Sequence, residues 1–260
     1  NIIPFFVFDG KPPPEKYDLL TQRKEIKQNA ENQYSELLIK YENTQDKNEK
    51  KNMMQTLNEL KQKFVRVRNT DKVHVKELLT AFGIMYYDSI NEADEVCAYM
   101  VKSGKAWACL SDDMDMFVYG CTRVLRNISL INKTVILYET PIILKELCMS
   151  EAHFKQIMVL SGTDYNIDTL TSLDTTISWY SKYKLALTDT TVKEIPSFYD
   201  WLLVNSDYIS DIDNLRTICQ MFTIHQLSHD PSLEKFEIIL NNRNDKLLHD
   251  IMEKEGFVFT

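Results

Sequence analysis

The sequence EADEVCAYMVKSGKAWACLSDDMDMFVYG at residues 92–120 is the most informative part of the chain for its fold class. Its first part has an acidic start and predicts a helix over 91–103, which Gly104 ends. The apolar run AWACL at 106–110 then predicts a strand that leads directly into the acidic sequence SDDMD at 111–115. A helix followed by a short buried strand is typical of an α/β protein with a parallel sheet.

The pattern continues on both sides of this stretch. Further strands are expected at 3–8, 84–87, 123–126 and 134–138. The chain from Pro141 onward is predicted to be helical, with breaks near 162–172, 189–196 and 228–232. The sequence therefore predicts an α/β fold with a central, mostly parallel sheet and an all-helical C-terminal region.

Residues 15–82 form a separate segment, which is almost free of Gly and Pro and rich in Lys, Glu, Gln and Asn. We expect helices at 15–42, 51–65 and 71–82. Because their apolar residues are sparse, these helices cannot belong to a core. They form either a coiled-coil spacer or a hairpin that projects from the body.

Carboxylates follow three of the predicted strands. Asp9 ends the strand at 3–8, Glu92 and Asp94 follow the strand at 84–87, and Asp113 and Asp115 follow the strand at 106–110. Because the carboxyl ends of parallel strands meet at one edge, these side chains are expected to gather there. Each acidic motif alone is common in proteins, since acids often occur at helix N-termini. Together the motifs favour a binding site for divalent cations. Oxygen ligands without His or Cys favour Mg²⁺ or Mn²⁺ over zinc.

The composition sets further limits. The 260 residues carry 30 Lys and Arg against 38 Asp and Glu, a net charge of −8 that argues against a nucleic-acid partner when taken alone. The charge is unevenly distributed, because residues 15–76 hold 14 basic and 10 acidic residues.

The five cysteines are scattered and indicate reduced thiols inside a cell. No apolar run is long enough for a membrane span, and no signal peptide is recognisable. A start without Met, directly at a strand, suggests a piece of a longer protein. Trp107, Trp179 and Trp201 are expected in the core.

Four segments of the chain resemble the flap endonuclease and XPG-type superfamily of structure-specific 5′ nucleases. They are FVFDGKPPPEK at 6–16, the acidic block at 92–120, TRVLRN at 122–127 and MVLSGTDYN at 158–166. Order and spacing agree over about residues 3–185. The resemblance implies a PIN-like nuclease domain and a two-metal hydrolysis of DNA phosphodiesters.

The resemblance also implies a ligand set for two Mg²⁺ ions, for which Mn²⁺ could substitute. The carboxylates that match the family's metal ligands are Asp9, Glu92, Asp94, Asp113, Asp115 and Asp164. Asp94 stands where the family usually has Glu. Asp112 and Glu95 match no metal ligand and are expected to be solvated or to cap helices.

The helical segment at 15–82 matches the family's arch, under which a single-stranded 5′ flap passes. Lys16 and Arg23 match the basic residues at the arch base and are expected to clamp the scissile phosphate as catalytic residues. Lys11, Arg66 and Arg68 are expected to contact DNA as well. The arch is somewhat longer than usual, which fits a modest insertion at its tip or a divergent member such as a viral one.

The chain departs from the family in three places. The family's N-terminal segment, which supplies a strand and one metal carboxylate, is missing from this sequence, so an incomplete metal site is expected. The segment at 169–183 lacks the glycines of the family's hairpin, so binding of K⁺ and of duplex DNA is left open, although a helix is expected at 175–184. A sliding-clamp binding motif is not found at 256–260, and clamp binding is not supported.

The sequence thus predicts a nuclease core at 1–185 and a helical extension at 186–260. The leading hypothesis is a 5′ flap endonuclease or 5′–3′ exonuclease in DNA replication, repair or recombination, acting as a monomer on branched or flapped DNA. Its site of action would be the nucleus or another site of DNA replication, or a cytoplasmic factory for a viral protein. Two alternatives remain: a junction-binding protein that has lost catalysis on the same fold, and a sheet protein with a coiled-coil spacer and no role with nucleic acid.

Overall fold

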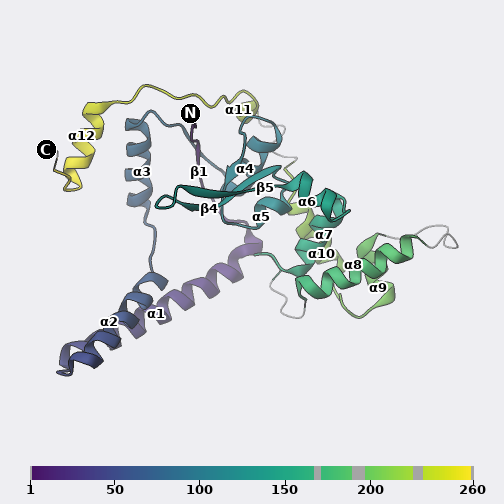
Figure 1. Ribbon diagram of the computed structural model, residues 1–260, viewed down its shortest axis with the longest axis horizontal. Coiled ribbons are helices and arrows are strands. Elements are labelled where there is room, and N and C mark those ends of the chain that lie inside the picture. Colours follow the sequence, from purple (N-terminus) through teal and green to yellow (C-terminus); the bar gives the residue numbers. More distant parts are fainter. Residues whose placement is uncertain (1, 167–170, 189–196, 225–230, 259–260) are drawn as a thin grey trace. The chain divides into compact units, whose positions relative to one another are not determined.

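The computed structural model describes residues 2–166, 171–188, 197–224 and 231–258. The expected break at 189–196 and most of that at 228–232 lie outside the described residues. The described elements are, in chain order, β1 (Phe6–Phe8), the 3-10 helix η1 (Pro14–Lys16), α1 (Tyr17–Asn43), α2 (Lys47–Lys63), α3 (Asn69–Ala81), β2 (Tyr86–Asp88), α4 (Ala93–Lys102), β3 (Cys109–Leu110), α5 (Asp115–Val118), β4 (Arg123–Ser129), β5 (Thr134–Glu139), α6 (Thr140–Glu146), α7 (Glu151–Ser161), α8 (Leu173–Leu187), α9 (Phe198–Asn205), α10 (Ile212–Met221), α11 (Pro231–Glu234) and α12 (Asp245–Lys254) (Figure 1).

The chain divides into two compact units. The first unit comprises residues 1–12 and 85–240, and the second comprises residues 13–84 and 241–260. The helices α9 to α11 of the predicted extension fall in the first unit, whereas α12 falls in the second. The predicted boundary at 185/186 therefore does not coincide with the division into compact units. The nuclease core at 1–185 and the helical extension at 186–260 stay predictions.

The predicted α/β class is confirmed in the first unit. β1 pairs with β2 in parallel, with Phe6 opposite Tyr86. β3 pairs with β4 in parallel, and β4 pairs with β5 as an antiparallel hairpin (Figure 1). These described strands form two sheets rather than one continuous sheet. β1 and β3 are shorter than the apolar runs that predicted them, because only part of each run has a hydrogen-bonded neighbour.

The core of the first unit lies behind the acidic segments. Met116, Phe117 and Val118 of α5 are almost fully buried and pack with residues of α7 and β4. Trp179 and Trp201 lie half-buried against this core, as expected. The prediction for Trp107 is wrong, since the residue is 62% exposed. Its ring instead lies under the guanidinium group of Arg123, with 5.2 Å between the guanidinium carbon and the ring centroid, so a cation–π contact at the surface accounts for it.

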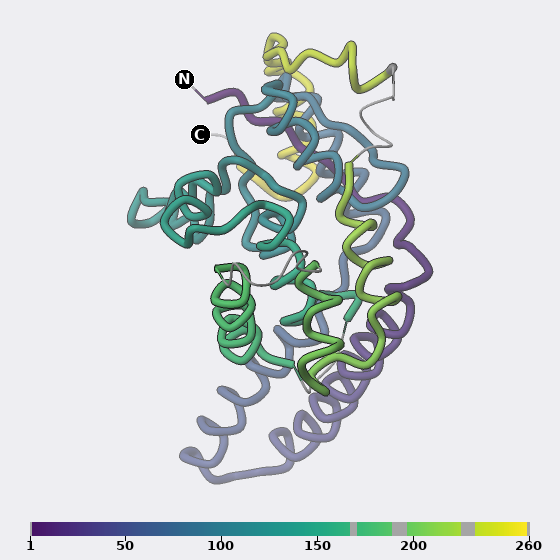
Figure 2. The backbone as a smooth tube through the Cα atoms, turned by 90° about the vertical axis from the view of Figure 1, so that its right-hand side faces the viewer, coloured from purple at the N-terminus to yellow at the C-terminus, as the bar shows by residue number. Residues whose placement is uncertain are grey.

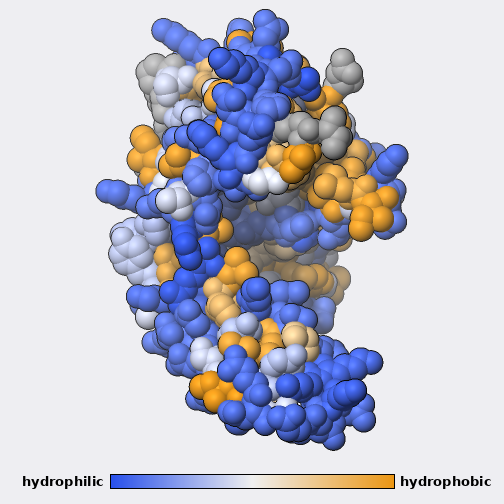
Figure 3. Space-filling model, turned by 90° about the vertical axis from the view of Figure 1, so that its left-hand side faces the viewer, coloured by the Kyte–Doolittle hydropathy of each residue, from blue (hydrophilic) through white to orange (hydrophobic). Residues whose placement is uncertain are grey.

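The second unit contains the predicted helical hairpin. α1 and α2 run side by side in opposite directions (Figure 2), and the polar break between them ends at Asp46. The Asp46 side chain accepts hydrogen bonds from the amides of Asn48 and Glu49 and thereby caps α2. Only Leu57 and Leu60 of α2 are buried. The rest of the surface of this pair is largely hydrophilic, as the lower half of Figure 3 shows, which confirms helices with a thin apolar stripe.

The end of the chain packs on α3 within the same unit. The amide of Asn241 donates to the carbonyl of Gly83, and the amide of Asn244 donates to that of Ala81. Gly83 adopts a φ of 71°, and an added Cβ would lie 2.3 Å from the Asn241 carbonyl oxygen. None of the helices within the described ranges combines the length and apolar character needed to cross a membrane.

Candidate metal centre

The loops that follow β1 and β2 are bound to each other through their backbones. The amide of Gly10 donates to the carbonyl of Asn91 (2.7 Å), and the amide of Lys11 donates to that of Ile90 (3.0 Å). The approach is so close that a Cβ on Gly10 would lie 2.1 Å from the Ser89 carbonyl oxygen. Glycine is therefore required at this position, and its small size brings Asp9 to the start of α4.

We expect Gly10→Ala to lower stability by about 2–3 kcal/mol, because the new methyl group forces apart two backbone segments that cannot yield like a side chain. Urea unfolding of the variant and of the wild-type protein measures the difference. Gly104→Ala measures a different cost for comparison: a Cβ there meets no atom within 4 Å, but the φ of 75° strains the backbone of an alanine. A Gly10→Ala protein of wild-type stability would contradict the steric account.

Asp9 caps helix α4 from 84 positions upstream. Its Oδ1 accepts a hydrogen bond of 2.9 Å from the amide of Ala93, the first residue of the helix. Glu92 occupies the N-cap position with extended backbone but makes no side-chain capping bond there. Asp94 lies in the first turn. The positive end of the helix dipole thus faces three carboxylates and offsets part of their repulsion.

Because of this cap, Asp9 has a structural role that can be measured apart from metal binding. We expect Asp9→Ala to cost about 1 kcal/mol of stability, whereas Asp9→Asn keeps an acceptor for the Ala93 amide and costs less. Both variants should bind Mn²⁺ more weakly than the wild-type protein. Urea melts and titration with Mn²⁺ check the two effects separately, and an Asp9→Ala variant of undiminished stability would refute the capping role.

The loop after β3 is held by its own side chains. The amide of Asp113 donates to Ser111 Oγ (3.1 Å), and the Oδ1 of Asp113 accepts from the amide of Asp115 (2.9 Å). This turn leads into α5, whose buried residues anchor it to the core. Asp112 has a different role, because its Oδ1 accepts from the amide of Asn127 at the β4 irregularity, where φ is 54°. Asp112 therefore supports the β4 backbone, in agreement with its lack of a predicted metal role.

Asp164 lies in the turn after α7. Gly162 ends the helix with a φ of 113°, and the amide of Asn166 donates to the carbonyl of Thr163 (3.1 Å). The following residue, Tyr165, reaches back to α4, where its hydroxyl donates to Glu92 Oε2. This hydrogen bond links the Asp164 turn to the start of α4.

Two tyrosines show where the carboxylates gather. Burial raises the pKa of Tyr119, and the charges of Glu92, Glu95, Asp94 and Asp115 raise it further. Burial likewise raises the pKa of Tyr165, with added effects of the hydrogen bond that its hydroxyl donates to Glu92 and of the charges of Tyr119, Glu92 and Asp115. Acidic residues at the starts of α4 and α5 therefore lie around the same pair of rings.

Neither Tyr119 nor Tyr165 was predicted from the sequence, although each belongs to a segment that carries the family resemblance. Glu95, which lies half-buried at the same place, has a raised pKa because of burial, while its bond with Asn91 acts in the opposite direction. Burial thus favours the neutral form of Glu95, for which no metal role is predicted.

The donor set suits hard divalent cations. It consists of carboxylate oxygens, half-buried at Glu92, Asp94, Asp115 and Asp164 and more exposed at Asp9 and Asp113. Such a set fits Mg²⁺ or Mn²⁺. The six ligand roles stay predictions.

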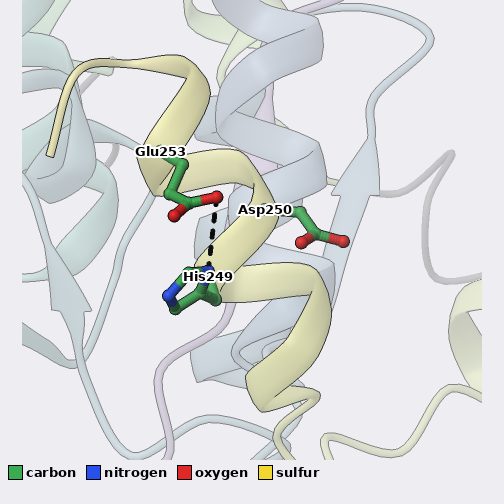
Figure 4. A group of neighbouring side chains, drawn as sticks. All are labelled: His249, Asp250 and Glu253. Carbon is green, nitrogen blue, oxygen red and sulfur yellow. Dashed lines mark ion pairs between the residues drawn. The ribbon is translucent and has the colours of Figure 1, made fainter. Parts of the chain in front are cut away.

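The six carboxylates do not bring their oxygen atoms as close together as a bound cation requires. Within the described ranges, the group whose ligand atoms all lie within 4.8 Å of one another is instead His249, Asp250 and Glu253 on α12 (Figure 4). All three of these side chains are exposed, and His249 Nδ1 lies 3.6 Å from Glu253 Oε2 as an ordinary i,i+4 pair.

The predicted basic residues are divided between the two units. Lys11 is exposed in the first unit, close to Asp9 in the chain. Lys16 precedes α1 and Arg23 lies on it, seven positions apart, so they occupy one face of the second unit's helix. Arg66 forms an ion pair of 2.7 Å with Glu31 and joins the end of the hairpin to α1. Arg68 is exposed at the start of α3. Their roles with DNA stay predictions.

Comparison with known proteins identifies the family. The model of the XPG I-region matches residues 83–164. Flap endonuclease 1 of Methanococcus aeolicus is 33% identical over 222 residues, which cover 85% of this chain and 59% of the relative. Flap endonuclease 1 of Saccharolobus solfataricus is 31% identical, covering 65% of this chain and 48% of the relative. The chain thus spans about half the length of the curated relatives that it matches.

Solved structures agree on the fold. The catalytic core of Rad2 in complex with DNA substrate superimposes with a TM-score of 0.64 at 21% identity, covering 98% of this chain and 74% of that chain. Human GEN1 in complex with Holliday junction DNA gives a TM-score of 0.51 at 19% identity, covering 97% of this chain and 56% of that chain. With the acidic block at 92–120 inside the XPG I-region match, the chain belongs to the flap endonuclease and XPG-type nuclease superfamily.

Proposed function

We propose that this chain forms the catalytic part of a structure-specific 5′ nuclease that hydrolyses phosphodiesters at flaps or branches in DNA. The observation that carries the proposal is that Glu92, Asp94 and Asp115 lie around Tyr119. Asp9 joins them, because its carboxylate caps α4, the helix that begins beside Glu92. Three separate chain segments supply these carboxylates, and Tyr165 links a fourth segment to them. The curated relatives named flap endonuclease 1 support the reaction class.

The residues proposed to hold the metal are the six carboxylates Asp9, Glu92, Asp94, Asp113, Asp115 and Asp164. Two divalent cations, Mg²⁺ or Mn²⁺ in its place, would supply an activated water and neutralise the leaving 3′ oxygen when bound. The chain's own contribution is a set of anchored carboxylates: the Asp113 turn is fixed by its hydrogen bonds, and Asp9 by the α4 amide. The product of such a hydrolysis carries a 5′-phosphate.

The hairpin of α1 and α2 is proposed as the arch for a single-stranded flap. Lys16 and Arg23, on one face of α1, would position the scissile phosphate by charge-assisted hydrogen bonds. The second unit's surplus of basic residues at 15–76 suits a phosphate backbone, although the whole chain is acidic. Branched substrates are in keeping with the Rad2 and GEN1 structures, which were solved with DNA substrate and Holliday junction DNA. The proposed activity would serve replication, repair or recombination of DNA.

The test is cleavage of a 5′-flap duplex, labelled at its 3′ end, by the full-length protein with Mg²⁺. We expect incision near the flap junction, a 5′-phosphate on the product and no incision in EDTA. Duplex without a flap is the control for structure specificity. Salt-dependent flap binding without incision in either Mg²⁺ or Mn²⁺ would overturn the proposal in favour of a junction-binding protein that has lost catalysis.

A further inference from the structure

Tyr165 makes a contact that the proposed function leaves unexplained. Its hydroxyl donates to Glu92 Oε2 across 73 positions of the chain. Glu92 stands at the N-cap of α4, and Tyr165 follows Asp164 directly. One hydrogen bond therefore joins two segments that each carry a proposed metal ligand.

The Tyr165 side chain is held from several directions. Its backbone lies in the turn after α7, where its amide donates to Thr163 Oγ1 (3.3 Å) and Asn166 Nδ2 donates to the Val159 carbonyl (3.1 Å). Its ring contacts Phe222 edge-on, with 5.5 Å between the ring centroids. Phe222 is 1% exposed and also packs against Tyr119, with 4.9 Å between the ring centroids. The position of the hydroxyl is thus set by the core rather than by solvent.

A carboxylate that binds a cation needs such an anchor. Outer hydrogen bonds orient metal ligands, and their loss typically costs 10–100-fold in metal affinity or activity. Glu92 makes no capping bond of its own at the start of α4, so the helix end does not fix its side chain. The Tyr165 hydroxyl is a partner that can do so, since it comes from a rigid neighbouring segment.

We infer that Tyr165 is a positioning residue, whose hydroxyl orients the Glu92 carboxylate and fixes its spacing from Asp164 for cation binding. The inference rests on the proposed function and goes beyond it, because it assigns a role to a side chain that does not itself bind metal. A merely structural role for Tyr165 would be carried by the ring and its contact with Phe222. The two roles can be separated, because phenylalanine keeps the ring and loses the hydroxyl.

The test is Tyr165→Phe in the full-length protein. We expect the dissociation constant for Mn²⁺, measured by calorimetry without DNA, to rise about 10-fold, and the Mg²⁺ concentration for half-maximal flap cleavage to rise similarly. Cleavage at saturating Mg²⁺ should recover most of the wild-type rate. In a Glu92→Gln background, the same change should add no further loss of Mn²⁺ affinity, since the carboxylate to be oriented is gone.

Tyr199→Phe is the matched control. The Tyr199 hydroxyl donates to the Gln156 carbonyl (2.7 Å), and Tyr199 is more deeply buried than Tyr165, at 1% exposure. Its hydrogen-bond partner is not one of the proposed metal ligands. This variant should lose stability and keep wild-type Mn²⁺ affinity. Unchanged Mn²⁺ affinity in Tyr165→Phe, or an equal loss in both variants, would overturn the inference. A wild-type protein that binds Mn²⁺ but never cleaves would overturn the proposed function alone, because the calorimetric comparison does not depend on cleavage.

Discussion

Asp113→Asn together with Asp115→Asn is expected to reduce flap cleavage at least about 10³-fold. Metal ions contribute several kcal/mol of charge stabilisation to phosphodiester hydrolysis, and each 1.36 kcal/mol is about a tenfold change in rate. The two residues belong to one turn, in which the Asp113 carboxylate accepts from the Asp115 amide. Asparagine can still accept this hydrogen bond, so the turn persists while two negative charges are lost. Single-turnover cleavage of a 5′-flap duplex measures the effect.

Asp112→Asn provides a control from the same loop. It removes one charge, and the asparagine can still accept from the amide of Asn127. Its rate should stay within a few-fold of the wild-type rate. Flap binding in EDTA should remain in the double variant, because the arch residues are unchanged. Cleavage at a wild-type rate by the double variant would show that the ligand assignment is wrong.

Lys16→Ala together with Arg23→Ala is expected to lower the single-turnover rate at saturating DNA by about 10²–10³-fold. The reason is the loss of the charged groups that would orient the scissile phosphate and stabilise charge in the transition state. Mn²⁺ affinity without DNA should be unchanged, because neither residue is one of the proposed ligands. Rapid-quench measurements of flap cleavage, combined with calorimetry, give both quantities.

The matched control is Lys24→Ala with Lys40→Ala, which removes two positive charges from other faces of the same helix. This variant should bind flap DNA somewhat more weakly at a given salt concentration and keep its cleavage rate at saturating DNA. Equal rate losses in the two double variants would contradict a specific role for Lys16 and Arg23 and would indicate general electrostatic attraction instead.

Much of the fold could be predicted because its signals are local. Helix α1 was expected at 15–42 and lies at Tyr17–Asn43, since a long run without Gly or Pro has few alternatives. The strand–carboxylate junctions at Asp9 and at the SDDMD loop were predicted by apolar runs that end in acids. Family membership followed from the same motifs and is confirmed by the relatives.

What could not be predicted depends on contacts between distant segments. The hydrogen bond from Tyr165 to Glu92 spans 73 positions, and no pattern in the sequence specifies which partner a tyrosine finds. Trp107 lies in an apolar run, yet it packs on Arg123 at the surface, because burial is decided by neighbours rather than by the run itself. The length of β3 depends on its pairing with β4, which a single strand does not encode.

The position of bound metal reveals directly which side chains are the ligands. We predict that crystals grown with Mn²⁺ show anomalous density among Asp9, Glu92, Asp94, Asp113, Asp115 and Asp164, and that the Asp113→Asn, Asp115→Asn protein loses it. Density confined to His249, Asp250 and Glu253 on α12 would contradict the ligand assignment, since those exposed side chains are an alternative place for a cation.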